Sequence, residues 1–363
     1  MSRNISLGWL MGAAVLLLLV LLPPIMGNTQ LALPTEVCIF GIFALTYDLI
    51  FGYAGLISFG QAIFVGFGAY SLSSALTDHG MAFWPSLLIV LFAGILISAL
   101  TGVMALRTRG VYFAMVTLAF AQAAFTLAES DVGSLTHGDN GVSITGAPDW
   151  LVGTTSQTHF YYVALAALVG SFLLLRLFVR SPAGRVWQAI RENEQRTRMI
   201  GYSPFAFKLL AYVISGTVCS LAGALYALYV GAVSPPIFSA DLTIQLLLMV
   251  IIGGAGSLWG AILGAAIVRS LIHYLNQLSG ADWVGNLPTW LHQTVGQPLL
   301  IFGVVYLALI YFFPQGIAGL ALRFNLGRTI GPRPGLDAVE GEAAALTPGD
   351  SAPGVEPTSA ESS

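Results

Sequence analysis

Charged side chains are scarce in this sequence. Only 9% of its 363 residues are Asp, Glu, Lys or Arg, and Lys208 is its single lysine. Soluble globular domains carry about 25% charged residues, so this composition excludes an ordinary water-exposed surface. With 56% hydrophobic residues and a mean hydropathy of +0.81, the chain is predicted to be an integral membrane protein.

The sequence also lacks the patterns of common catalytic and metal sites. Lys208 is not followed by Ser or Thr, so there is no Walker A motif and no ATP hydrolysis by that route. No HExxH or GxSxG pattern occurs, and the five histidines are scattered. Cys38 and Cys219 lie in apolar segments, where cysteine is typical of a small buried hydrophobe. We therefore expect no enzymatic activity, metal or cofactor in this chain.

Long apolar runs dominate instead. A helix needs about 20 residues to cross roughly 30 Å of hydrocarbon. Suitable runs are residues 7–22, 35–51, 58–77, 84–106, 111–129, 158–179, 206–231 and 296–318. Residues 241–271 are too many for one span and contain the run Gly253-Gly254-Ala255-Gly256, which predicts two short spans joined by a tight turn. The expected fold class is all-α, a polytopic membrane protein with about ten transmembrane helices.

The basic residues sort to one side of the membrane only with an even number of spans. With ten, the loops 78–83, 130–157, 232–240 and 272–295 face outward and contain no Lys or Arg. The remaining bases then lie in the cytoplasm, as the positive-inside rule requires, with only Arg269 ambiguous. We expect cytoplasmic termini, a transmembrane domain over residues 1–330 and a disordered cytoplasmic tail over 331–363, which has few bulky apolar side chains.

The densest charge of the chain lies between Ser181 and Gly201. Ser181 suits an N-cap, Pro182 the first helical position and Gly201 a left-handed end, so one cytoplasmic helix is predicted. Two acid–base pairs have the favourable spacing of four: Glu192 with Arg196, and Glu194 with Arg198. Apolar residues would leave a surface for a partner to cover: Val186, Trp187, Ile190 and Met199. The alternative is an amphipathic helix that lies on lipid headgroups.

Glycines gather at two further places. GYAGLISFG, residues 52–60, predicts either a short cytoplasmic turn or a broken helix that lines a pathway. Gly256, Gly260 and Gly264 recur every four residues, and so do Gly216, Ser220 and Ala224. Such stripes let helices approach closely in lipid, either within one chain or against another subunit. Asp48, near the end of its span, either serves transport or reaches headgroup water.

Four stretches resemble, in the right order, the permease subunits of ABC importers of the branched-chain amino-acid type, most closely the LivM type. They are GYAGLISFGQAIFVGFGAY, RTRGVYFAMVTLAFAQ, GRVWQAIRENEQRTRMIGYSPFAFKLLAYVISGTVCSLAGALYA and IIGGAGSLWGAILGAAIV, and they cover most of residues 52–268. Many members of that family carry His where this chain has Gln61, a departure that bears on the substrate.

The resemblance implies a type II-like permease subunit of a binding-protein-dependent importer, multi-pass in the cell inner membrane. It would translocate branched-chain or other apolar amino acids by alternating access. The implied partners are a second homologous permease, two ATPase subunits that bind ATP and Mg, a periplasmic solute-binding protein, the solute and the lipid bilayer, with no nucleic acid. Two alternatives stay open: a permease for urea or short amides, and a stand-alone channel or secondary carrier.

The resemblance also implies roles for individual residues. The cytoplasmic coupling loop 181–205 would contact the ATPase through Gly184, Arg185, Ile190, Arg191, Glu192, Asn193 and Gly201. A second group would line the translocation pathway or pack helices: Gly52, Gly55, Ser58, Gly60, Gln61, Gly256, Gly260 and Gly264. The outward loop 130–157 would be either a lip that receives the solute-binding protein or a solvated Gly-rich loop.

Overall fold

The computed structural model describes residues 31–131, 136–138, 141–146 and 157–279, with the single positions 20, 23, 148 and 303. Six described helices are long and apolar enough to cross a membrane, and a shorter apolar helix, Ala240–Gly253, accompanies them. The chain is therefore an all-α polytopic membrane protein, as predicted. The expected spans 7–22 and 296–318, apart from positions 20 and 303, and the expected tail 331–363 lie outside the described residues.

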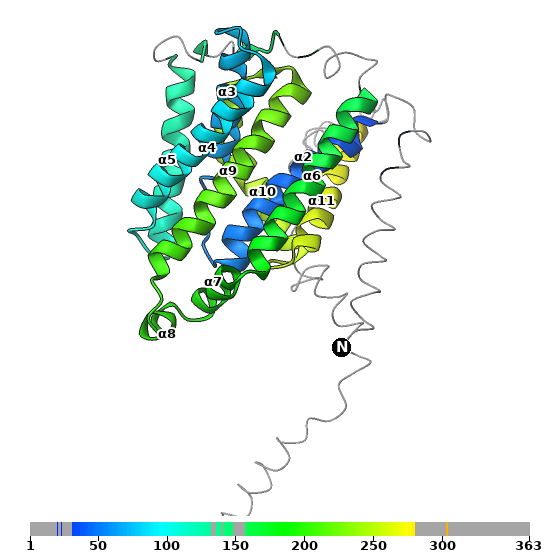
Figure 1. Ribbon diagram of the computed structural model, residues 1–363. Helices are drawn as coiled ribbons and strands as arrows, with labels where there is room; N and C mark the ends of the chain where they lie inside the picture. Colours follow the sequence, from blue (N-terminus) through cyan, green and yellow to red (C-terminus); the bar gives the residue numbers. More distant parts are fainter. Residues whose placement is uncertain are drawn as a thin grey trace, which may run out of the picture. The chain divides into compact units, whose positions relative to one another are not determined.

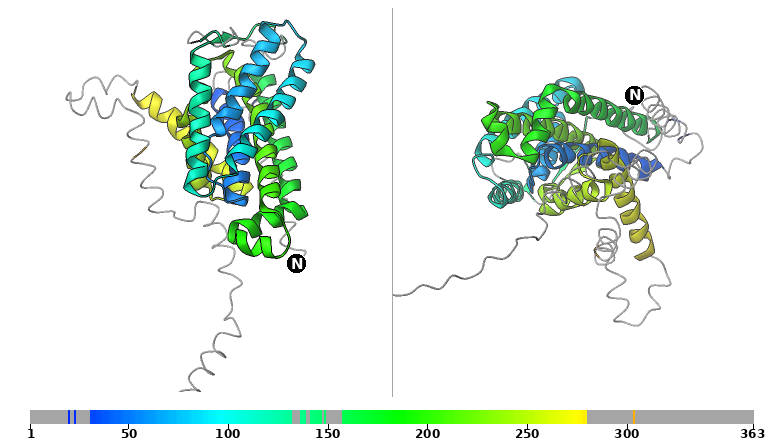
Figure 2. Two further views of the ribbon diagram at one scale, coloured as in Figure 1. Left: turned by 90° about the vertical axis from the view of Figure 1, so that its left-hand side faces the viewer. Right: turned by 90° about the horizontal axis from the view of Figure 1, so that it is seen from below.

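The described elements follow one another in the order α2 (Ala32–Asp48), π-helix η2 (Leu49–Tyr53), α3 (Gln61–Thr77), α4 (Phe83–Ala105), α5 (Val111–Glu129), β1 (Val142–Ser143), α6 (Gln157–Arg180), α7 (Pro182–Glu192), α8 (Glu194–Met199), α9 (Pro204–Val230), β2 (Ala232–Val233), 3₁₀-helix η5 (Pro235–Phe238), α10 (Ala240–Gly253) and α11 (Leu258–Ser279). The long helices run side by side, and α7 and α8 lie together at one end of them (Figures 1 and 2). We call this end of the bundle the loop end.

Helix α2 lies inside the bundle. Apolar residues lie on all of its sides, and a helix of that kind is covered either by lipid or by other helices. Helices α6, α9, α10 and α11 supply that cover. From Cys38 to Asp48 every residue is buried. Packing against these four helices therefore places α2 at the core, where contacts from distant segments converge.

Helix α4 separates its two faces by side-chain size. Its exposed face carries large apolar side chains four residues apart: Trp84, Leu88, Phe92, Leu96, Leu100 and Met104. Its buried face carries small ones at the same spacing, from Ser86 through Gly94 and Ser98 to Gly102. In lipid, large apolar side chains gain nothing from leaving the surface, whereas small ones allow close helix contact. The exposed stripe therefore faces lipid, and the small-residue face packs inward.

The small residues of α4 meet those of α9. A Cβ placed on Gly94 would lie 2.9 Å from the Cβ of Ser220, and one on Gly216 would overlap the Cβ of Ser98. The predicted stripe at Gly216 and Ser220 therefore packs helices within this chain. Close approach of the two helix backbones here requires residues no larger than Ser.

Residues 241–271 form two helices with a turn between them, as predicted. The turn needs glycine, because Gly254 has φ +104° and Gly256 has φ +85°. Where α10 and α11 cross, a Cβ on Gly264 would overlap the carbonyl oxygen of Met249, and a Cβ on Gly253 would overlap that of Gly260. The contact of this stripe is thus with α10 of the same chain, and the idea that it faces another subunit is wrong for these glycines.

Replacing Gly264 by alanine is expected to lower the free energy of unfolding by about 1–3 kcal/mol, because the added methyl group forces the two backbones apart. Gly170, in α6, is the matched control, since a Cβ added there would have no atom within 4 Å. Gly170→Ala should be neutral or slightly stabilising, because it removes a helix-interior glycine. Thermal unfolding in detergent measures both, and equal melting temperatures would show that the crossing tolerates the methyl group.

The GYAGLISFG segment folds back into the bundle. Helix α2 ends in η2, and residues 54–60 follow as a non-helical connection before α3 begins at Gln61. The Tyr47 hydroxyl donates a hydrogen bond to the Ser58 carbonyl at 3.0 Å, so the connection runs back along α2. Tyr47 precedes Tyr53 by six residues, or on the order of 9 Å of helix. Helix α3 therefore starts inside the bundle, in protein surroundings that satisfy its irregular backbone.

Candidate functional site

The charged loop at the loop end is two helices and not the single predicted helix. Asn193, with φ −159° and ψ 101°, is extended and separates α7 from α8. Its side-chain oxygen accepts a hydrogen bond from the Arg196 backbone N–H at 2.9 Å, which makes it the N-cap of α8. Ser181 and Pro182 begin α7 as predicted, although the Ser181 hydroxyl donates to the Phe178 carbonyl instead of capping α7.

The apolar face of α7 is covered by its own chain. Val186, Trp187 and Ile190 are buried, and the Trp187 indole N–H donates to the Phe207 carbonyl of α9 at 2.7 Å. The expectation that these residues leave a surface for a partner is therefore wrong. Only Met199, 83% exposed, remains uncovered among the predicted apolar residues. A tryptophan buried in this way cannot lie on lipid headgroups, so it does not anchor an interfacial helix.

Two further contacts fix the loop to the spanning helices. Gly184 packs against the end of α6, where a Cβ would overlap the Val179 carbonyl oxygen. Lys208 of α9 forms an ion pair with Glu194 of α8 at 2.6 Å. Glu194 also pairs with Arg198 at 3.5 Å, as its spacing predicted. Gly184 therefore serves packing within the chain, and it is not open to a partner.

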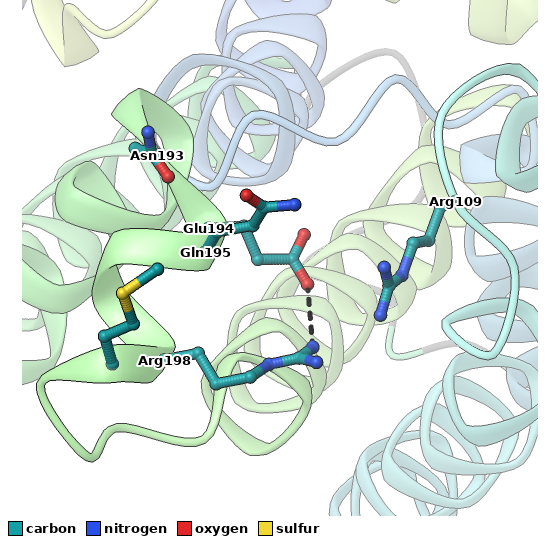
Figure 3. A pocket seen from close by; sticks show the side chains of 6 residues that line it. Arg109, Asn193, Glu194, Gln195 and Arg198 are labelled. Carbon is teal, nitrogen blue, oxygen red and sulfur yellow. Dashed lines mark hydrogen bonds and ion pairs between the residues drawn. The ribbon is translucent and has the colours of Figure 1, made fainter.

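The other face of the loop is exposed and polar. The exposed residues of α7 and of the start of α8 include Arg185, Gln188, Ala189, Arg191, Glu192, Asn193, Gln195 and Arg196. Beside α8 lies a cavity of about 650 Å³, lined by Arg109, Asn193, Glu194, Gln195, Arg198 and Met199. Figure 3 shows Glu194 between Arg198 and Arg109, with Arg109 reaching in from the connection between α4 and α5. A short loop is thus bonded to the bundle on one side and free on the other.

A second group of contacts brings distant glycines to the loop. The Arg191 guanidinium of α7 donates to the Gly52 carbonyl of η2. Gly55, with φ +71°, packs against the same arginine, and Gly256 donates its N–H to the Asp48 carboxylate at 2.7 Å. Asp48 is fully buried, so the alternative in which it reaches headgroup water is wrong.

Gln61 occupies the polar centre of the bundle. Its amide nitrogen donates to the hydroxyls of Thr46 at 3.3 Å and Ser215 at 3.1 Å, which joins α3 to α2 and α9. The N–H of Ala62 donates to the Thr243 hydroxyl of α10 at 3.0 Å. Ser58 and Gly60 lie just before it, and the Ser58 hydroxyl accepts the Gly60 N–H at 3.2 Å. Gln61 is completely buried, so these hydrogen bonds at the start of α3 hold four helices together.

The described part of the loop 130–157 is fastened at the opposite end. Strand β1 pairs with β2, with Val142 opposite Val233. The Thr77 hydroxyl at the end of α3 accepts the Thr145 N–H at 3.1 Å. His137 lies 3.6 Å from Asp78. The described parts of this loop are therefore bonded to two connections between spans.

Comparison with known proteins decides the family. Residues 31–314 match the family described as "Branched-chain amino acid transport system / permease component". The chain belongs to this permease family. The LivM permease of a high-affinity branched-chain amino acid transport system in Escherichia coli K12 is 31% identical over 296 residues, covering 73% of this chain and 69% of that protein.

More distant relatives match the chain at lower identity. A probable LivM permease of Methanocaldococcus jannaschii is 24% identical and covers 76% of this chain and 89% of that protein. The autoinducer 2 import permease LsrC of Photorhabdus laumondii is 25% identical over 181 residues, covering 48% of this chain and 50% of that protein. A solved structure, PsaBC of Streptococcus pneumoniae in complex with Fab, aligns with a TM-score of 0.41 at 13% identity, over 83% of this chain and 96% of that one.

The structure groups the predicted site residues of the permease differently from the sequence. Gly52, Gly55 and Gly256, predicted to line the pathway or pack helices, come together with Arg191, which was predicted to contact the ATPase. Gly260 and Gly264 lie in the crossing of α10 and α11 instead. Gly201, with φ +95°, ends the loop in the left-handed region, as predicted. Within the described residues, no group of His, Cys, Asp or Glu could hold a metal ion.

Some residues of the site were not predicted from the sequence. Lys208 and Arg109 act on Glu194 from α9 and from the connection between α4 and α5, 14 and 85 positions away in the sequence. Thr46, Ser215 and Thr243 form the partners of the α3 start. A hydroxyl within an apolar span is a weak signal, because Ser and Thr also bond their own helix backbone.

Three basic side chains, Lys208, Arg109 and Arg198, act on the Glu194 carboxylate. Partial burial raises its pKa, but the hydrogen bond from Lys208 and the positive charges of Lys208, Arg109 and Arg198 outweigh that effect. The pKa of Glu194 is therefore lowered from its ordinary value of 4.5. A carboxylate whose pKa is lowered by folding stabilises the fold above its ordinary pKa, and this stabilisation is lost as the pH falls through the lowered pKa.

We expect α8 to stay attached to α9 from pH 7 down to about pH 4.5 and to become mobile below it, as Glu194 is protonated. A spin label on Gln195→Cys, which is exposed, reports this mobility, since Cys38 and Cys219 are buried. Glu194→Gln should raise the mobility at pH 7 to the level that the native residue reaches only in acid. The same mobility in both proteins at pH 7 would show that the ion pair does not hold α8.

Proposed function

We propose that this permease is one of two membrane-spanning subunits of a binding-protein-dependent ABC importer in the cell inner membrane. Its α7–α8 loop faces the cytoplasm and docks on an ATPase subunit, and both termini lie on the same side. A second homologous permease, two ATPases that bind ATP and Mg, and a periplasmic solute-binding protein complete the assembly. The solutes are branched-chain or other apolar amino acids, in keeping with the names of the LivM relatives.

The observation that carries this proposal is the two-sided loop. Trp187, Gly184 and Glu194 bond α7 and α8 to the ends of spanning helices α6 and α9, while the opposite face stays polar and exposed. A loop held in this way moves as a body with the spans, which is what a lever between an ATPase and a pathway requires. The described bases other than Arg269 lie at or within a turn of the loop end, which favours a cytoplasmic position.

The rival functions receive less support. A proton- or sodium-coupled carrier relies on carboxylates inside the membrane that are free to bind its ion. In the part of the chain that the structure describes, one oxygen of Asp48 accepts the Gly256 N–H, and Glu36 pairs with Arg269. A urea or short-amide permease would share the same loop, so only the solute distinguishes it. The loop 130–157, whose described parts are bonded to the end of the bundle opposite the loop end, would receive the solute-binding protein.

The test uses an exposed alanine on each of two surfaces. Ala189 lies on the free face of α7, and Ala166 lies on the exposed face of α6. We expect Ala189→Trp to reduce ATPase retention on the purified permease pair at least tenfold, because the bulky ring prevents close docking. Ala166→Trp should retain the ATPase as the native chain does. Full retention by Ala189→Trp would refute docking at this face.

The solute is tested separately in proteoliposomes that contain the complete importer. We expect ATP-dependent uptake of radiolabelled leucine that excess valine or isoleucine competes away and urea does not. Competition by urea alone would instead identify a urea permease.

A further inference from the structure

Three segments that are far apart in the sequence meet at one point of the loop end. They are η2 at the end of α2, the turn between α10 and α11, and α7. Arg191 of α7 donates to the Gly52 carbonyl, and the Gly256 N–H of the turn donates to Asp48, one helical turn before Gly52. We call these four residues, Asp48, Gly52, Arg191 and Gly256, the junction.

The junction leaves no room for larger residues. A Cβ on Gly52 would overlap both an Asp48 carboxylate oxygen and the Gly256 nitrogen. A Cβ on Gly256 would lie 3.1 Å from the Arg191 guanidinium and 3.2 Å from the Gly52 carbonyl oxygen. Gly55, next along the chain, touches the Arg191 stem in the same way, since a Cβ there would lie 3.0 Å from its Cγ. The backbones of η2 and of the turn are therefore in close contact, and α7 reaches them through the Arg191 side chain.

Charge strengthens the same contacts. Asp48 is fully buried, and Arg191 is the cation that acts on its carboxylate across the Gly52 peptide. Hydrogen bonds to charged groups are roughly twice as strong as neutral ones, and the surroundings here are apolar. One oxygen of Asp48 accepts the Gly256 N–H, and the other has no hydrogen-bond partner among the described residues. Separating Arg191 from the junction would leave a buried carboxylate without its cation, which is costly.

The local backbone is irregular where the junction forms. Residues 49–53 are a π-helix, with the Ala54 N–H bonded to the Leu49 carbonyl and the Leu56 N–H to that of Ile50. Single π-turns inside α-helices are uncommon and occur frequently at functional sites. The segment that follows, residues 54–60, is the non-helical connection to Gln61. A displacement of Gly52 is therefore passed directly to the start of α3 at the centre of the bundle.

We propose that Arg191 is a positioning residue that transmits movement of the α7–α8 loop to η2 and to the turn between α10 and α11. This inference rests on the proposed docking of an ATPase at the loop. Arg191 is an exposed residue of α7, but its guanidinium donates to Gly52, so we assign it to the contact with η2 instead of to the ATPase surface. The direct contact of Arg191 with Gly52, and of Gly52 with Gly256, carries the displacement to both segments. The loop then moves α2, α3, α10 and α11 together. The apolar contacts of Trp187 do not move these helices by themselves.

The experiment places an environment-sensitive fluorophore on Ala255→Cys, an exposed position of the turn. The complete importer in nanodiscs receives Mg-ATP, and the fluorescence change reports movement at the turn. We expect Arg191→Gln to reduce this change at least fivefold and to lower the melting temperature, because the buried Asp48 loses its cation. ATPase retention and ATP hydrolysis should stay within roughly twofold of the native values. Arg191→Lys keeps a cationic donor for Gly52 and should restore at least half of the change.

Arg107→Gln is the matched control, because Arg107 is an exposed arginine in the connection between α4 and α5, outside the α7–α8 loop. It should leave the fluorescence change at the native level. A native-sized change in Arg191→Gln, or an equal loss in Arg107→Gln, would overturn the inference and leave the proposed function standing. Loss of ATPase retention in Arg191→Gln would also overturn it, since Arg191 would then be a docking residue. Failure of the native chain to retain any ATPase would remove the proposed function and this inference together.

Discussion

Replacing Trp187 by alanine is expected to lower the free energy of unfolding by about 3–5 kcal/mol, the range for deletion of a large buried side chain. Trp187 is completely buried between α7 and the start of α9, and it donates to the Phe207 carbonyl. The substitution leaves a cavity where the loop joins the bundle and removes the hydrogen bond to the Phe207 carbonyl. We expect a lower melting temperature, rapid proteolysis at residues 193–203 and loss of ATPase retention.

Two variants separate the causes of that loss. Trp187→Phe fills most of the cavity and removes only the indole hydrogen bond, so its expected cost is about 1–2 kcal/mol. Gln188→Ala changes the neighbouring exposed side chain and should be within about 0.5 kcal/mol of the native protein. Denaturant or thermal unfolding in detergent measures all three. A Trp187→Ala protein as stable as Gln188→Ala would mean that the loop does not depend on this contact.

Replacing Gln61 by glutamate is expected to have an effect of similar size, about 3–5 kcal/mol, because an unpaired charge would be buried at the centre of the bundle. The amide nitrogen that donates to Thr46 and Ser215 would become an oxygen that cannot donate when ionised. We expect the contacts of α3 with α2 and α9 to weaken. Uptake by the assembled importer should fall at least tenfold.

The controls for Gln61 distinguish charge from hydrogen bonding. Gln188→Glu makes the same chemical change on the exposed face of α7 and should leave stability unchanged. Gln61→Leu removes the donors without adding charge, and its expected cost is smaller, about 1–3 kcal/mol. Unfolding at pH 7 ranks the three variants. A Gln61→Glu protein as stable as the native one would show that solvent reaches this position, which would favour a pathway role for Gln61 over a packing role.

The positions of the spans could be read from the sequence because hydrocarbon imposes a length and a composition on any helix that crosses it. The predicted runs 111–129 and 158–179 agree with α5 and α6 within a residue at each end. The division of residues 241–271 followed from glycines that allow positive φ, and Gly254 and Gly256 have it. Family membership was also visible in sequence, since four ordered stretches carried the resemblance that the family match confirms.

Two features of the charged loop were not predicted from the sequence: the cover of its apolar face and the break at Asn193. Helical periodicity showed that α7 has an apolar face, and that part of the prediction is confirmed. What covers the face is not a property of the segment, because Phe207 and its neighbours reach Trp187 only after α9 has folded against α7. The break at Asn193 was missed for a similar reason. Its neighbours are good helix formers, and the extended Asn193 with its cap on Arg196 suits a chain that must turn toward Lys208.

The sequence by itself determined the class of this protein, the approximate positions of the described spans, the small-residue stripes along which helices pack, and the family. Those properties depend on composition and spacing within single segments, which lipid constrains strongly. Only the tertiary structure decided that Arg191 reaches Gly52, that Asp48 holds Gly256 and that Gln61 joins three helices. Each of those contacts links segments between 15 and 208 positions apart, and hydrogen bonds act only between atoms about 3 Å from each other. Packing of the whole bundle therefore creates both the junction and the hydrogen-bonded group around Gln61.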